Sequence, residues 1–438
     1  MLFLTGTTKR FPGVFLRTSL YPTAPRTKAV GSILTDNAAK SPQKVISIPM
    51  NAQVIFPKKS SHGPARFLSL VLGFVRKNTV FCIALVLAVV SAFLVPPDGE
   101  YLSYFDFRTL TCLFCTLAVV CALKNIRFFT ILARKIVKMT GSTRSAVLSL
   151  VYITFLGSML IANDMALLTF LPLGYFVLTS TGKEKYMAFT FIMQNIAANL
   201  GGMLTPFGNP QNLYLYSRFS IPTGEFLSIM IFPFLLSVAL ITAICLLFVK
   251  KEPIAVTEEF PYTLPRTRTV VYLLLFAFSI VIVFRLIPYW IGLIVIPLSL
   301  LFLDRRALLQ VDYCLLGTFV CFFLFAGNIS RLGAVHDFFT EMLNKSVLFV
   351  SVGSCQFISN VPTAILLSRF THDYRALLYG VNIGGTGTLI ASLASLITFR
   401  EYTSHNPEKA GYYVGLFSLF NFAFLLILTA FCYFLLKL

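Results

Sequence analysis

Long apolar runs with few or no charged residues recur along this 438-residue chain. Each run is close to the roughly 20 apolar residues that a helix needs to cross a bilayer. Only 12% of the residues are charged, too few to cover a soluble protein of this size. The sequence therefore predicts an all-α polytopic membrane protein of about 11 segments. The expected segments are 78–96, 107–123, 145–182, 186–217, 225–249, 270–287, 288–303, 313–330, 346–368, 375–399 and 411–437.

The 36 Lys and Arg residues outnumber the 17 Asp and Glu residues and lie mainly between the apolar runs. Basic loops mark the cytoplasmic side of a membrane protein, so we expect the lipid bilayer as a partner and no nucleic acid. The loop after the first span carries Asp98, Glu100 and Asp106 without a base. The segment before that span is therefore expected inside the cell, as is the basic segment 124–144.

One apolar stretch is too long for a single span. Between Arg144 and Lys183 the only charged residue is Asp164, near the middle. At about 1.5 Å per residue, a straight helix of that length would reach roughly twice the bilayer core. The stretch must turn back, either as two full spans or as a re-entrant hairpin with its tip inside the protein. Asp164 is then either a loop residue or, as we prefer, an intramembrane acid that couples an ion or a proton.

The two halves of the chain contain matching polar motifs, which indicate an internal repeat. Each half has an Asn-containing turn followed by an Asn-x-Gly-Gly segment. Orientation by charge runs the two halves in opposite directions through the membrane, so the repeats are predicted to be inverted. The aligned motifs are Ile161-Ala162-Asn163 with Ile358-Ser359-Asn360, and Asn199-Leu200-Gly201-Gly202 with Asn382-Ile383-Gly384-Gly385.

Adjacent glycines, with prolines in the first half, cannot continue a helix unbroken. Unwinding frees backbone carbonyls that suit a cation and amides that suit an anion. Inverted repeats with broken helices are typical of secondary transporters, whose site lies where the repeats meet. The substrate site is predicted to consist of Asn163, Asn199, Gly201, Gly202, Thr205, Asn209, Asn212, Ser359, Asn360, Thr363, Asn382, Gly384, Gly385, Thr386 and Thr388.

Close helix packing is the alternative interpretation of the Gly, Ser and Thr residues. Packing explains Ser392 and Ser395 well. It explains Asn209 and Asn212 poorly, because amides at membrane depth are costly unless they are used or solvated.

Other chemistries find little support in the sequence. The nine cysteines lie mostly inside apolar runs, and Cys112 with Cys115 has no second pair to complete a metal site. There is no GxxxxGK[ST] motif for a nucleotide and no HExxH motif. An intramembrane enzyme is therefore the disfavoured alternative, and we expect no catalytic residues, no cofactor and no resident metal.

Composition divides the chain into four parts. Residues 1–66 hold ten Lys or Arg and the single acid Asp36, and we interpret them as a disordered, cytoplasmic extension. A transit peptide, or a true start near Met50 that would leave residues 1–49 out of the mature protein, stays open. We expect a first transporter repeat at 67–251, a Pro-rich cytoplasmic linker at 252–268, and an extra helix with the second repeat at 269–438.

At these motifs the chain resembles the ion-transporter superfamily, in its citrate-transporter-like and anion-permease branch. Residues 198–213 resemble the first broken helix of that branch, and 359–364 with 381–390 resemble the second. The likeness covers roughly 78–437. It implies re-entrant hairpins at 145–182 and 346–370, and an elevator-like or rocking motion of the elements that carry the site.

Sodium-coupled dicarboxylate members of this branch have a Ser-Asn-Thr tip in both hairpins. The first tip here is Ala162-Asn163-Asp164, which is closer to arsenite permeases, and the second is Ser359-Asn360-Val361. The expectation is a plasma-membrane carrier of a small anion, a carboxylate or an inorganic oxyanion, coupled to H⁺ or Na⁺. Arsenite efflux, Na⁺/H⁺ exchange, an organellar membrane and a homodimer stay open. A coupling Na⁺ would lie near Asn163, Gly201, Asn360 and Gly384.

Overall fold

The computed structural model describes residues 72–75, 78–254 and 263–437, and in these ranges the regular structure is helical. No strand occurs in them, although Ser142 and Pro253 form an isolated antiparallel bridge. The predicted extension 1–66 and part of the predicted linker 252–268 lie outside the described residues.

The first half contains α2 (Thr79–Leu94), η1 (Gly99–Tyr104), α3 (Phe107–Asn125), α4 (Phe128–Lys138), α5 (Thr143–Ile161), α6 (Asn163–Ser180), η2 (Glu184–Tyr186), α7 (Met187–Gly201), η3 (Gly202–Leu204), α8 (Pro210–Arg218) and α9 (Thr223–Phe248). The second half contains α10 (Arg266–Val283), α11 (Tyr289–Leu303), α12 (Arg305–Leu309), α13 (Tyr313–Ser330), α14 (Gly333–Lys345), α15 (Val347–Ile358), α16 (Asn360–Leu367), α17 (Tyr374–Ile383), α18 (Leu393–His405), η4 (Pro407–Lys409) and α19 (Ala410–Leu435).

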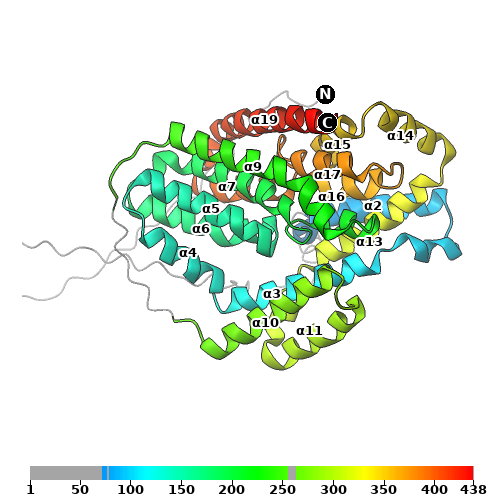
Figure 1. Ribbon diagram of the computed structural model, residues 1–438, viewed down its shortest axis with the longest axis horizontal. Helices are drawn as coiled ribbons and strands as arrows, with labels where there is room; N and C mark the ends of the chain where they lie inside the picture. Colours follow the sequence, from blue (N-terminus) through cyan, green and yellow to red (C-terminus); the bar gives the residue numbers. More distant parts are fainter. Residues whose placement is uncertain (1–71, 76–77, 255–262, 438) are drawn as a thin grey trace, which may run out of the picture. The chain divides into compact units, whose positions relative to one another are not determined.

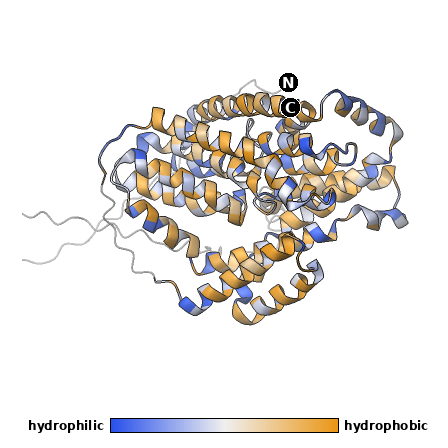
Figure 2. Ribbon diagram, in the orientation of Figure 1, coloured by the Kyte–Doolittle hydropathy of each residue, from blue (hydrophilic) through white to orange (hydrophobic). Residues whose placement is uncertain are grey.

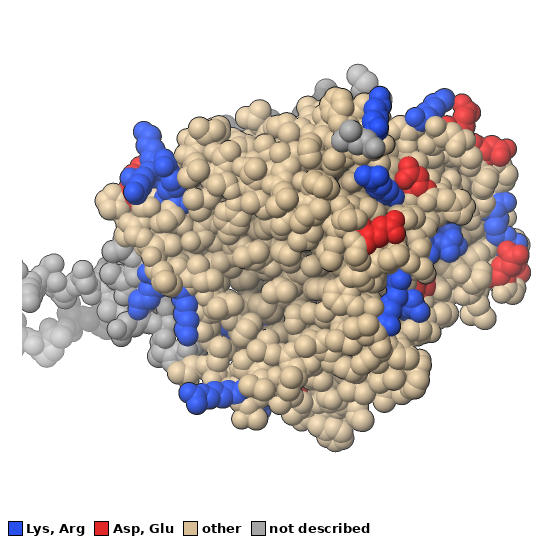
Figure 3. Space-filling view, viewed as in Figure 1, with Lys and Arg blue, Asp and Glu red and all other residues tan. Residues whose placement is uncertain are grey.

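Six helices of the described part are long and apolar enough to cross a membrane, among them α3, α9 and α13. Apolar residues cover most of the helix surfaces, and hydrophilic residues lie mainly at helix ends and loops (Figure 2). On the face in Figure 3, a belt without charged side chains separates an end with mainly Lys and Arg from an end with both signs. The predicted all-α polytopic membrane protein is confirmed.

The two halves repeat one order of elements. In the first, α3 is followed by α4, the hairpin α5–α6, the broken helix α7–α8 and the long helix α9. In the second, α13 is followed by α14, the hairpin α15–α16, the broken helix α17–α18 and the long helix α19. The equivalent helices α4 and α14 lie at opposite ends of this bundle (Figure 1). The predicted inverted repeats with broken helices are therefore confirmed.

Both hairpins turn on one residue with left-handed φ. Ala162 has φ 66° and ψ 153°, and its equivalent Ser359 has φ 71° and ψ 161°. Non-glycine residues at such angles cost about 1–3 kcal/mol and persist where the surroundings demand them. In each hairpin the next residue is an Asn whose side chain accepts from the following amide at 2.9 Å. The two tips thus share backbone and side-chain geometry.

The second hairpin is too short to be two full spans. α15 has 12 residues and α16 has 8, so at about 1.5 Å per residue neither reaches across a core of about 30 Å. α5 and α6 are longer, with 19 and 18 residues. The short lengths of α15 and α16 support a re-entrant second hairpin.

Two helices differ from the sequence-based prediction, which left α4 and α14 as loops. Basic residues interrupt the apolar run in α4, yet Phe129, Ala133 and Val137 recur at four-residue spacing and are buried. A helix with one narrow apolar stripe is amphipathic, and α4 packs with that stripe against α3, α5 and α6.

Candidate functional site

The predicted polar breaks of the two halves meet in the interior. Asn199 Oδ1, on α7, accepts hydrogen bonds from Asn163 Nδ2 at 3.1 Å and from Ser392 Oγ at 2.9 Å. Asn163 lies at the first hairpin tip, whereas Ser392 precedes α18 in the second half. One amide therefore joins the first hairpin to the second broken helix.

A second set of contacts joins the first broken helix, α7–α8, to α17 of the second. Asn209 Nδ2 donates to the Asn199 carbonyl at 3.2 Å and to Asn382 Oδ1 at 3.4 Å. Asn382 Nδ2 donates to Asn212 Oδ1 at 2.6 Å. We call Asn163, Asn199, Asn209, Asn212, Asn382 and Ser392 the amide network; each is at most 4% exposed.

Four helices begin at this network or directly beside it. α6 begins at Asn163 and α16 at Asn360, while α8 and α18 follow the N-cap residues Asn209 and Ser392. Asn360 belongs to the same centre, since a Cβ built on Gly385 would lie 3.0 Å from its Nδ2 and 3.6 Å from Asn199 Oδ1. Helix N-termini expose unpaired N–H groups and a partial positive charge. The positive ends of four helix dipoles therefore converge on a network whose own side chains are neutral, with Asp164 beside it in the first turn of α6.

Two atoms of the network have no hydrogen-bond partner among the residues that the structure describes. They are the donor Asn199 Nδ2 and the acceptor Asn209 Oδ1. Their residues are 2% and 1% exposed. A buried polar group without a partner costs about 1–3 kcal/mol, so each such atom in a native protein needs an explanation. A polar ligand that accepts from one and donates to, or coordinates, the other would supply it.

The paired glycines divide into two roles. A Cβ on Gly201 would overlap the carbonyl oxygen of Phe155, and one on Gly384 would lie 2.8 Å from Cys355. These two glycines let α7 and α17 pack closely against α5 and α15. Gly202 instead abuts Asn209 Oδ1, so it and Gly385 border the network.

The predicted threonines do not join the network. Thr205 Oγ1 donates to the Met159 carbonyl at 2.9 Å, and its equivalent Thr388 donates to the Gln356 carbonyl at 3.0 Å. The hydroxyls of Thr363 and Thr386 donate to carbonyls within their own segments. These hydroxyls are occupied in holding the hairpins and breaks together.

Two polar residues of the second half were not predicted as site residues. Gln356 Nε2 donates to the carbonyls of Gly384 and Thr386 at 3.0 and 3.2 Å, and its Oε1 accepts from the Thr388 amide. Gln356 thereby satisfies the unwound backbone of the second break. Ser392, which the sequence attributed to packing, is part of the network. Ser359 Oγ donates to the Ala391 carbonyl at 3.2 Å and so ties the second tip to this break.

A small cavity lies beside the network. Its lining includes Ala162, Pro210 and Leu393, each the chain neighbour of a network residue. Most of the remaining lining is apolar and comes from α3, α6 and the start of α13.

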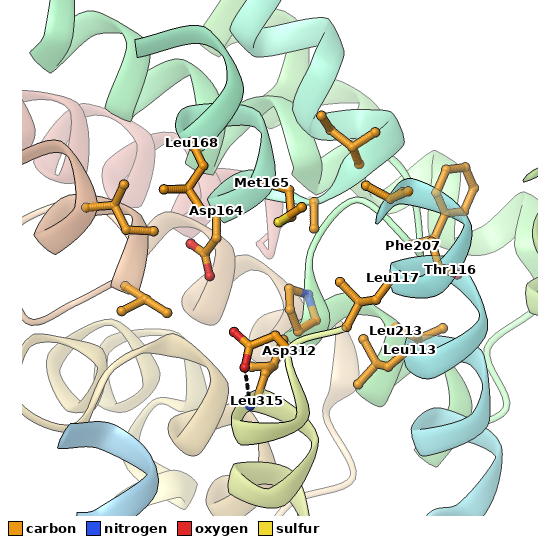
Figure 4. A pocket seen from close by; sticks show the side chains of 16 residues that line it. Leu113, Thr116, Leu117, Asp164, Met165, Leu168, Phe207, Leu213, Asp312 and Leu315 are labelled. Atoms are coloured by element: carbon orange, nitrogen blue, oxygen red, sulfur yellow. Dashed lines mark hydrogen bonds between the residues drawn. The ribbon is translucent and has the colours of Figure 1, made fainter. Parts of the chain in front are cut away.

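Asp164 and Asp312 face each other across this cavity (Figure 4). Asp164 follows the first hairpin tip, and its Oδ1 has no hydrogen-bond partner in the described part of the chain. Asp312 caps α13 by accepting from the Leu315 amide at 2.9 Å. The sequence singled out Asp164 but not Asp312, because an Asp before an apolar helix is an ordinary N-cap signal.

Among the described residues, no three His, Cys, Asp or Glu side chains gather as a metal site would require. Cys112 and Cys115 are both buried within α3.

Comparison with known proteins decides the family. The profile of the family described as citrate transporter matches residues 67–373, which is most of the chain. The chain belongs to the citrate transporter family. This confirms the resemblance to that family, and it makes the chain an integral-membrane transporter. The matched residues include the first broken helix and end before the second.

Two relatives support the assignment. An uncharacterized transporter of Methanocaldococcus jannaschii is 29% identical over 327 residues, which cover 74% of this chain and 89% of the relative. The inner membrane protein YbiR of Escherichia coli is 29% identical over 281 residues, which cover 62% of this chain and 74% of the relative.

Proposed function

We propose that this member of the citrate transporter family is a secondary carrier of a small anion, a carboxylate or an inorganic oxyanion, bound at the amide network. The observation that carries the proposal is the meeting of four helix N-termini around a buried centre that contains no charged side chain. Backbone and side-chain N–H groups at positive helix ends suit an anion. The unpartnered Asn199 Nδ2 is one donor available to it.

The neutral character of the site supports transport rather than tight storage. Amides bind an anion by hydrogen bonds without the strong attraction of a buried Arg or Lys. Release at the other side of the membrane then costs less. Asn209 Oδ1 remains available for a cation that accompanies the anion.

We further propose that Asp164 couples transport to H⁺ or Na⁺. Its carboxyl lies in the cavity beside the network and opposite Asp312. Two carboxylates that face each other repel when both are ionised, so they favour uptake of a proton or a cation between them.

Na⁺/H⁺ exchange on the same fold, or arsenite efflux, is the second candidate. The observation in its favour is the same pair of acids, which would repel an anion that enters through this cavity. In either case we place the carrier in the plasma membrane, and a homodimer is the proposed assembly.

The test is transport into vesicles reconstituted with the purified chain. Citrate, other carboxylates, phosphate, sulfate and arsenite are offered with a Na⁺ gradient, with a pH gradient and with neither. Uptake of a carboxylate, phosphate or sulfate that depends on one gradient supports the first candidate. Transport of arsenite alone, or proton or Na⁺ flux that requires no anion, supports the second and contradicts the first.

Two variants test whether the amide network binds the transported substrate. Asn199→Ala and Asn382→Ala should each raise the half-saturating concentration roughly ten- to hundredfold, because losing a hydrogen-bonding partner in a buried site costs about 1–3 kcal/mol. Asn421→Ala is the matched control, since Asn421 is a fully buried amide on α19 outside the network. Normal uptake by both network variants would contradict the site.

A further inference from the structure

α4 exposes large apolar side chains as well as bases. Leu132, Ile136 and Met139 are 49%, 40% and 87% exposed, and their spacing of four and three residues places them along one strip of the helix. The adjacent side of the helix packs on the protein through Phe129 and Ala133. An apolar strip that the protein itself does not cover is suited to contact with the acyl chains of a membrane.

Bases flank this strip. Lys135 and Lys138 are exposed, as are Arg127 at the N-cap of α4 and Lys124 in the last turn of α3. Lys124, Lys135 and Lys138 form no ion pair with any residue that the structure describes. The sequence contains no acid from 107 to 163, so no neighbour along the chain neutralises them.

The equivalent helix of the second repeat provides an internal comparison. α14 carries Asp337 and Glu341, and its Lys345 pairs with Glu341 at 2.9 Å. It also exposes an apolar residue, Phe338. Both helices therefore fit a membrane interface, but only α4 combines its apolar strip with unneutralised positive charge.

We propose that α4 is a binding site for anionic phospholipids of the cytoplasmic leaflet, with the apolar strip in the acyl region and Lys135 and Lys138 on the headgroups. Amphipathic basic helices bind anionic interfaces in this way. α4 connects α3 to the hairpin that carries Asn163 and Asp164. A bound lipid would therefore fix the position of the helix that leads into the hairpin of the proposed transport site. This holds for any substrate.

The test uses tryptophan fluorescence of the full chain. The sequence has one tryptophan, Trp290, so a Trp290→Phe, Leu132→Trp chain reports from α4 alone. In vesicles, brominated phosphatidylglycerol should quench this signal more than brominated phosphatidylcholine at equal mole fraction. Adding Lys135→Gln and Lys138→Gln should reduce the preference about fivefold for each lysine, while quenching by phosphatidylcholine stays.

Lys345→Gln on α14 is the matched control and should leave the preference unchanged. A second measurement needs no tryptophan: phosphatidylglycerol should raise the melting temperature of the unmodified chain in detergent, and less so that of the Lys135→Gln, Lys138→Gln variant. Equal quenching by the two lipids, or an unchanged preference in the double variant, would overturn the proposal. So would a melting temperature that rises equally with inorganic phosphate, which would indicate a site for free anions.

Discussion

Asp164 breaks the symmetry between the two hairpin tips. The tips share their φ and ψ angles and the hydrogen bond from the Asn side chain to the next amide. The residue that supplies this amide is Asp164 in the first tip and Val361 in the second. The amides are thus common to both repeats, whereas the acid belongs to one, so binding and coupling can be tested separately.

Asp164→Asn should remove the pH dependence of transport while leaving substrate binding near its normal value. The amide keeps the size of the carboxyl but cannot exchange a proton. Initial uptake rates between acidic and alkaline pH measure the effect, with Asp373→Asn, an exposed N-cap of α17, as the control. An unchanged profile in Asp164→Asn would exclude this carboxyl from coupling.

Two helical glycines should differ in how much stability the protein loses when each is replaced by alanine. Gly201→Ala forces a Cβ onto the Phe155 carbonyl oxygen, and backbone cannot move aside as a flexible side chain would. We expect a loss of about 1–3 kcal/mol, typical of overpacking, seen as a lower melting temperature in detergent. Gly353→Ala on α15 is the control, because nothing lies within 4 Å of its built Cβ. It should be neutral or stabilising by about 0.5–1 kcal/mol.

The inverted arrangement of α4 and α14 predicts labelling from opposite sides. Gly141 follows α4 and Asp337 lies on α14, and both residues are exposed and lie outside the apolar strip. A membrane-impermeant maleimide added to intact cells should label Asp337→Cys but not Gly141→Cys, and inside-out vesicles should reverse this. The parent chain, with its nine native cysteines, serves as the blank. Labelling of both variants from one side would contradict the topology.

At the level of elements, the sequence predicted every long helix and both breaks, because apolar runs and Gly-Pro clusters are local signals. The amphipathic helices α4 and α14 were missed because their apolar residues are spaced along a helix face rather than consecutive. Asp312 was missed for a different reason. It has the same local pattern as Asp106, another N-cap, and only the folded arrangement brings it opposite Asp164.

In the whole molecule, the two repeats are held together at their polar centre rather than by apolar packing alone. Partners of each network residue come from distant parts of the chain, as in the bonds from Asn163 and Ser392 to Asn199. Sequence could predict that two such breaks exist and that they oppose one another. Which amides bond to which depends on side-chain rotamers in the packed state, and no local pattern encodes that.

An ion-pair cluster joins the start of the linker to the first repeat. Glu252 contacts Lys183 and lies 2.9 Å from Lys185, and these hydrogen bonds lower the pKa of Glu252 from 4.5 to about 2. A carboxyl whose pKa is lowered in the folded state stabilises the fold at pH values above its unfolded pKa. This stabilisation is lost as the pH falls through the folded pKa.

Glu252→Gln should therefore lower the melting temperature in detergent at neutral pH. The difference from the parent chain should shrink as the pH falls from 4.5 towards 2, where the parent loses the same interaction. Glu408→Gln is the control, because Glu408 is exposed and forms no ion pair among the described residues. A difference that stays constant down to pH 2 would contradict this assignment.

The amide network has no charged side chain, so a membrane voltage has little to act on when the empty carrier reorients. Between Arg144 and Lys183, the part of the chain that forms the first hairpin, Asp164 alone carries charge. Moving one elementary charge through 100 mV changes the free energy by about 2.3 kcal/mol. The voltage dependence of the step in which the empty carrier reorients would therefore show whether Asp164 crosses protonated or ionised. The current carried during the step with bound substrate would give the number of charges that cross with each substrate.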